Sequence, residues 1–143
     1  MLLGDVFTNI WENVTRVPSQ ILMKIDIEQF ECRAFLGSPE VLAQPQIIPI
    51  IAVIMEWTFA EGGADNPKCT KEQVTQLAKH FLESEYTPFR VFGGISPFNG
   101  FPQLSKLDIS NFGVDWNCNV VWLSNYVVTD VSSVVNILAF DSI

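Results

Sequence analysis

Four charged side chains stand close together in one short stretch of a weakly charged sequence. Residues 24–31 read KIDIEQFE and directly follow the apolar residues ILM, although only 17% of the 143 residues are charged. Carboxylates placed in this way can accept hydrogen bonds from hydroxyl or amino groups, act as general bases, or bind a hard metal ion. Asp26 and Glu28 are therefore the first candidates for chemistry.

A predicted strand positions this stretch. Ile21 to Ile27 is an apolar run broken only by two charges, a pattern typical of a strand covered on both faces in a parallel sheet. Ile47 to Trp57, rich in β-branched residues, predicts a second buried strand. Ligands of open α/β sheets bind beyond the carboxyl ends of the strands, so neighbouring strands would bring their terminal charges to one edge. The candidates on this edge are Lys24, Asp26, Glu28 and Glu56.

The remaining sequence alternates between predicted helices and strands. Helices are predicted over Asp5–Val14, over Glu28–Leu42 with an interruption near residues 37–39, and over Thr70–Leu82, where Thr70 and Gln73 have capping-box spacing. Further strands are predicted over Tyr86–Phe92 and Asn119–Leu123, with a connection rich in glycine, proline and asparagine at Gly93–Phe112. Strands separated by helices predict right-handed parallel crossovers, and therefore an α/β fold.

A purely structural role is an alternative for two of the acids. Glu28 and Glu31 fall in the first turn of a predicted helix, where acids interact favourably with the positive end of the helix dipole. Asp26 is harder to explain in this way, because an acid inside a buried strand costs several kcal/mol unless it is paired or solvated at a pocket. Asp26 is therefore the stronger candidate.

Composition excludes some classes of partner. Sixteen acids against eight bases give a formal charge of -8, which disfavours nucleic acid and anionic membrane surfaces as partners. The longest apolar stretch, residues 47–55, contains Pro49 and is far shorter than the roughly 20 residues of a membrane-spanning helix. We therefore expect no membrane segment. No signal peptide is predicted, because Asp5 interrupts the apolar start; the compartment stays unknown, and is cytoplasmic by default.

Cysteine and histidine add no further chemistry at this level. Cys32, Cys69 and Cys118 are odd in number and far apart, which predicts three free thiols rather than a disulfide framework or a zinc site. The single histidine, His80, falls near the end of a predicted helix, where a structural role is expected. A hydrolase built on carboxylate-bound metal is disfavoured, because no histidine accompanies the acids.

The charged stretch also carries a family resemblance. ILMKIDIEQFECRAFLGS resembles the signature of FkbM-type methyltransferases, in which a buried strand ends in Lys-Ile-Asp-Val-Glu-Gly and runs into a helix with a further Glu. LLGDVFTNIWENVTRVPSQ before it, and IAVIMEW, AKHFLESEYTPFRVF and GVDWNCNVVWL after it, are similar to family segments in the same order, so the resemblance covers Leu3 to about Leu123. Two positions depart from the pattern: Gln29 and Glu85 stand where the family has glycine.

The resemblance implies a Rossmann-like class I methyltransferase fold, but only part of it. That fold has the strand order 3-2-1-4-5-7-6, and this sequence corresponds to strands four to seven with their intervening helices. The first half, whose glycine-rich turn binds S-adenosylmethionine, has no counterpart, since neither Gly62-Gly63 nor Gly93-Gly94 follows a strand and opens a helix. Residues 1–123 are thus expected to form the C-terminal part of the domain, and residues 124–143 an unassigned tail.

What the resemblance implies about activity is methyl transfer from S-adenosylmethionine, expected at oxygen, to a small-molecule acceptor. Asp26 would take the acceptor's proton, Glu28 would support it, and Lys24 and Glu56 would contact acceptor or cofactor. The isolated chain is expected to be inactive and to bind no S-adenosylmethionine. The alternative is a non-catalytic truncated isoform or interaction module that pairs with itself through the open edge of the strand Ile21–Ile27.

Overall fold

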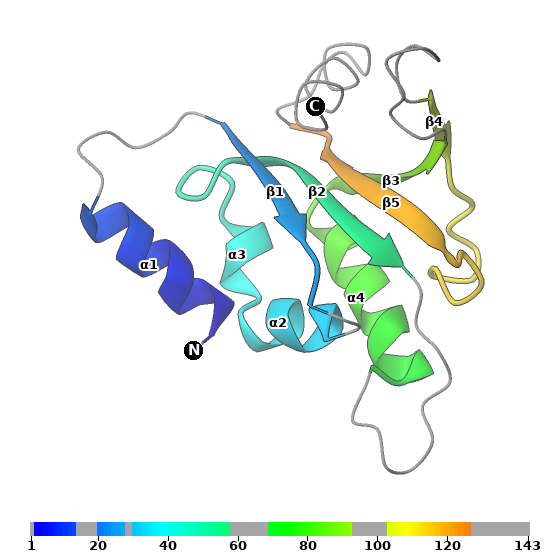
Figure 1. Cartoon of the computed structure of the whole chain (residues 1–143), viewed down its shortest axis with the longest axis horizontal. Helices are drawn as coiled ribbons and strands as arrows, with labels where there is room; N and C mark the ends of the chain where they lie inside the picture. The colour runs from blue at the N-terminus through cyan, green and yellow to red at the C-terminus, as the bar shows by residue number, and fades with distance from the viewer. Residues whose placement is uncertain (1, 14–19, 28–29, 58–68, 93–102, 127–143) are drawn as a thin grey trace.

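The computed structural model of the chain describes residues 2–13, 20–27, 30–57, 69–92 and 103–126. Its helices are α1 (Leu3–Asn13), α2 (Glu31–Gly37), α3 (Glu40–Ala43) and α4 (Lys71–Glu83). Its strands are β1 (Ile21–Ile25), β2 (Ile50–Trp57), β3 (Tyr86–Phe92), β4 (Gln103–Lys106) and β5 (Cys118–Ser124), as Figure 1 shows.

The strands form one mixed sheet in the order β1-β2-β5-β3-β4. β1 runs parallel to β2, whereas β5 runs antiparallel to both of its neighbours, β2 and β3, and β4 is antiparallel to β3. The predicted α/β fold is confirmed, but the expectation of parallel crossovers throughout is wrong. β2 and β3 point the same way and α4 connects them, whereas the described residues between β3 and β5 form β4 and turns, and antiparallel neighbours need no crossover helix.

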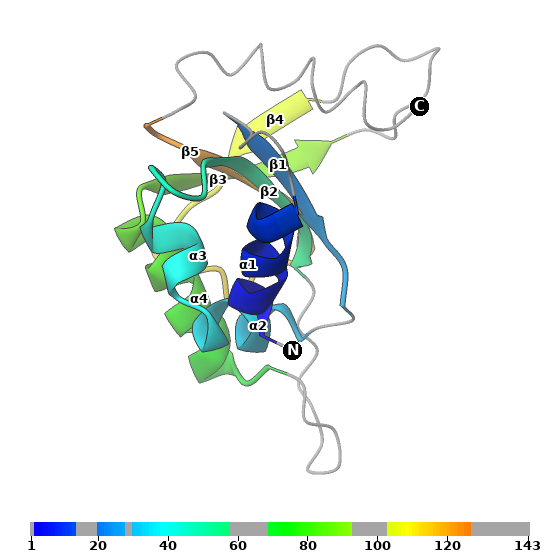
Figure 2. The same ribbon diagram turned by 90° about the vertical axis from the view of Figure 1, so that its left-hand side faces the viewer.

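All four helices lie on one face of the sheet (Figure 2). The main core lies between the helices and the sheet. At its centre the Phe81 ring of α4 stacks on Trp122 of β5, with ring centroids 4.4 Å apart and planes 7° from parallel. The Tyr86 hydroxyl donates to the Ile50 carbonyl at 2.8 Å, which satisfies a buried polar group. A smaller apolar cluster lies on the other face of the sheet and is formed by Ile51, Ala52, Val121 and Leu123.

Helix α4 follows directly from its sequence. The Gln73 N–H donates to Thr70 Oγ1 at 3.1 Å and the Thr70 N–H donates to Gln73 Oε1 at 2.9 Å, which confirms the predicted capping box. The stripe that faces the sheet consists of Val74, Leu77, Ala78 and Phe81, all buried. Their i, i+3, i+4 spacing is what places them on one side of the helix.

Strand β1 is less buried than its apolar sequence suggests. It lies at the edge of the sheet, pairs with β2 among the described strands, and buries only Ile25, while Lys24 is exposed. The prediction of a strand covered on both faces and continuing to Ile27 is therefore wrong. An apolar run reports that a segment can be covered, but not whether a neighbouring strand is present to cover it.

The cysteines also differ from the prediction. Cys32 and Cys69 form a disulfide, with Cα atoms 6.1 Å apart, and Cys118 is a free thiol. The two bonded cysteines are 37 residues apart in sequence, yet the packing of α2 against α4 brings them together. Spacing in the sequence alone could not show this contact.

Candidate functional site

The carboxyl ends of β1 and β2 meet at one edge of the sheet, as expected. Ile25 of β1 is paired with Met55 of β2 in parallel register. Asp26 and Glu56 are the next residues along the two chains, so they lie at the same level on neighbouring strands, and both are exposed. We call Lys24, Asp26 and Glu56 the acidic edge.

Lys24 precedes the two acids on the same edge. It is opposite Ile54 of β2, and its side chain is exposed. Met23 and Ile25 on either side of it pack into the core under the helices, so Lys24 extends from the opposite face of the sheet. Glu28, the second predicted catalytic residue, lies outside the described residues.

Asp26 needs no compensation for burial. It follows β1 instead of lying inside it and is solvent-exposed, so the premise that it is an acid within a buried strand is wrong. Its candidacy therefore depends on its position at the end of a strand, where hydroxyl or amino groups of a ligand could reach it.

Glu31 is the residue whose environment the sequence did not reveal. Its side chain is only 1% exposed, and Oε1 accepts a hydrogen bond from the Ile27 N–H at 3.2 Å. Oε2 is buried and has no hydrogen-bond partner among the described residues. The Glu31 side chain thus links Ile27, the residue after Asp26, to the first residue of α2. In the sequence, Glu31 is the further Glu of the family signature, but its position in the first turn of a helix is explained equally well by a favourable interaction with the helix dipole.

The disulfide begins at the residue after Glu31. Cys32 is the second residue of α2, which continues from β1, and Cys69 precedes Thr70, the N-cap of α4, which continues from β2. The bond therefore connects the two segments that leave the acidic edge.

Chemically, the acidic edge offers two exposed carboxylates and one ammonium group. The carboxylates can accept hydrogen bonds from a ligand's hydroxyl or amino groups or take a proton from one of them. Within the part of the chain that the structure describes, no group of three or more His, Cys, Asp or Glu side chains could hold a metal ion. Likewise, none of the described helices is long and apolar enough to cross a membrane.

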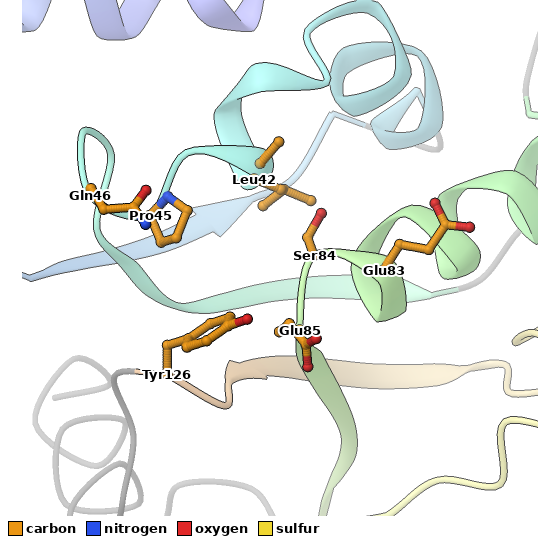
Figure 3. Close-up of a pocket in the computed structure, with 8 residues that line it drawn as sticks. Leu42, Pro45, Gln46, Glu83, Ser84, Glu85 and Tyr126 are labelled. Atoms are coloured by element: carbon orange, nitrogen blue, oxygen red, sulfur yellow. The ribbon is translucent and has the colours of Figure 1, made fainter.

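A cavity of about 460 Å³ lies at the other end of the strands from the acidic edge. Its lining comes from the end of α3 and the following loop, the end of α4 and the turn after it, and one residue after β5: Leu42, Ala43, Pro45, Gln46, Glu83, Ser84, Glu85 and Tyr126. Figure 3 shows Pro45 and Gln46 across the cavity from Tyr126. Because β2 and β3 begin here, the cavity is separated from the acidic edge by the length of the strands.

One residue of this lining has an unusual backbone. Glu85 has a φ of 66°, in the left-handed region that glycine adopts most readily. It occupies one of the two positions where the FkbM pattern has glycine, so the departure seen in the sequence corresponds to a strained turn between α4 and β3. That strain is of order 1–2 kcal/mol for a residue with a side chain.

His80 lies away from the acidic edge. It is on α4 and hydrogen-bonds to the backbone of Pro39, next to α3. Burial lowers the pKa of His80, and the hydrogen bond and the nearby Glu83 offset part of this effect. The ring is half-buried, and its buried Nε2 has no hydrogen-bond partner among the described residues.

Known proteins provide no further guide. Comparisons with protein-family models, with curated proteins and with solved structures find no match for this chain. Its function is therefore inferred from its own residues and from the arrangement of its strands.

Proposed function

We propose that this chain is the C-terminal part of an FkbM-type, S-adenosylmethionine-dependent methyltransferase domain. The observation that carries the proposal is the strand order. Without β4, the sheet reads β1-β2-β5-β3, and if these are strands four, five, seven and six, the order agrees with the 4-5-7-6 half of the methyltransferase sheet. The agreement is informative because β5 separates β2 from β3, although strands that follow one another in sequence are usually neighbours.

The position of the charged stretch gives independent support. Of the KIDIE stretch, Lys24 and Ile25 lie at the end of β1 and Asp26 and Ile27 follow it, and Glu56 lies at the end of β2. In the proposed assignment these are the carboxyl ends of strands four and five, the edge where ligands of α/β sheets bind.

The residues of this chain do not by themselves fit the cofactor. S-adenosylmethionine supplies the methyl group, and the glycine-rich strand-turn-helix that would bind it has no counterpart in the sequence. The acidic edge can nevertheless serve the acceptor. Asp26 accepts a hydrogen bond from the acceptor hydroxyl and takes its proton, Glu28 supports it, and Lys24 and Glu56 orient the acceptor.

A second candidate is an interaction module that pairs through β1. The observation that favours it is the position of β1 at the sheet edge, where a strand presents unpaired backbone donors and acceptors to another chain. Lys24, exposed on this strand, opposes such pairing. Light scattering after size-exclusion chromatography tests the idea: a dimer that Leu22→Pro converts to monomer supports it, and a monomeric wild-type chain contradicts it.

The methyltransferase proposal is tested at Asp26 in the completed domain, made by joining this chain to the cofactor-binding half of an FkbM-type enzyme. Asp26→Asn should lower methyl transfer by about a hundredfold, the scale of general base catalysis. Its melting temperature should not change, because the side chain is exposed. Glu12→Gln, which changes an exposed acid on α1, is the matched control. Unchanged turnover in Asp26→Asn, with or without a lower melting temperature, would contradict the assignment.

A further inference from the structure

The Cys32–Cys69 bond joins two elements that are already packed together. Phe35 of α2 and Phe81 of α4 have ring centroids 5.1 Å apart, and the cysteine Cα atoms are 6.1 Å apart, within the usual range for a disulfide. The geometry of the folded core thus selects this pair of cysteines. The bond can form once α2 and α4 dock, without rearrangement of either helix.

Both sulfur atoms are enclosed in the main core. Cys32 is 0% exposed and Cys69 is 4% exposed. A reductant must bring its thiolate in line with one of these sulfurs, so access controls the rate of reduction. Reduction therefore requires α2 to separate from α4. This distinguishes the bond from an exposed, regulatory disulfide.

The third cysteine is poorly suited to exchange with this bond. Cys118 is the first residue of β5, paired with Trp57 of β2, and it packs at the border of the core. Burial raises the pKa of its thiol, with Arg90 partly offsetting this effect. A small thiolate fraction makes Cys118 a slow nucleophile at neutral pH.

We propose that Cys32 and Cys69 are a modification site that is oxidised while the chain folds in an oxidising compartment, and that the bond is then a permanent structural link. In the reaction two thiols lose two protons and two electrons. The electrons reduce a protein disulfide of the oxidoreductase class to its dithiol, and the two thiols of that product receive the protons. In the cytosol, where thiols are kept reduced, the bond would not form as the chain folds. The proposal does not depend on methyl transfer.

The compartment is tested on the protein in the cells that make it. Rapid acid quenching, alkylation of free thiols in denaturant and mass spectrometry give the number of free cysteines. One alkylated cysteine, mapped to Cys118, supports the proposal, and three alkylated cysteines overturn it.

The permanence of the link is tested on the purified, oxidised full chain with Cys118→Ser, which removes the remaining thiol. Dithiothreitol should reduce the bond at least about a hundredfold more slowly in native buffer than in concentrated urea, because reduction waits for the core to open. Similar rates under the two conditions would identify an accessible redox switch instead. Protection of α2 and α4 against hydrogen exchange, measured on the same samples, verifies that the native sample is folded.

Discussion

Breaking the Cys32–Cys69 bond should cost this chain about 4 kcal/mol of stability. The bonded residues are 37 positions apart. In the chain-entropy model, a bond that closes a loop of this length lowers the conformational entropy of the unfolded chain by about 13 cal/mol/K, which corresponds to about 4 kcal/mol of stability near room temperature. The native state should lose little else, because two thiols can fill the same buried space as small apolar groups.

Urea denaturation of the oxidised and reduced forms, both in Cys118→Ser, measures this difference. With a denaturant slope of about 2 kcal/mol/M, the midpoint should fall by about 2 M on reduction. Tryptophan fluorescence is a suitable probe, because Trp57, Trp116 and Trp122 form one aromatic cluster in the core. Equal midpoints with equal slopes would refute the reasoning, since they would mean that the bond does not constrain the unfolded chain relative to the native one.

Two further predictions concern single side chains. Glu85→Gly should stabilise the chain by about 1 kcal/mol in urea denaturation, because glycine adopts the left-handed φ of Glu85 without strain. The control Ser84→Gly, at an ordinary φ of -85°, should destabilise the chain in the same titration. A loss of stability in Glu85→Gly would show that Glu85 is not strained. As pH falls below 6.5, the unfolded state binds a proton at His80 more readily than the folded state, in which the pKa is lowered, so stability should fall. His80→Gln should lose less stability over that pH range than wild type, and parallel melting curves for the two proteins would show that His80 plays no part.

The local sequence pattern predicted individual helices and strands better than it predicted which other elements they contact. The capping box of α4 and the extent of β3, Tyr86–Phe92, were both predicted correctly, because each depends on residues close in sequence. β3 contains Pro88, which is tolerated because pairing with β4 begins only at Phe89. β4, with the sequence QLSK, was not predicted, since four largely polar residues form a strand only through pairing with a neighbour.

The candidate site shows the same division. The acids at the ends of β1 and β2 were placed on one edge by the parallel pairing that the sequence indicated. The exposure of Asp26, the burial of Glu31 and the Cys32–Cys69 bond were not predicted. Each depends on which elements pack together in three dimensions, and neither the spacing nor the hydrophobic pattern of the sequence contains that information.

The most direct test of the central claim is a calorimetric titration with S-adenosylmethionine. The chain alone should show no binding tighter than roughly millimolar, and the chain joined to the cofactor-binding half of an FkbM-type domain should bind in the micromolar range, a difference of about 4 kcal/mol. Micromolar binding by the chain alone, or none by the joined domain when it is folded, would contradict the claim that this sheet is the second half of a methyltransferase.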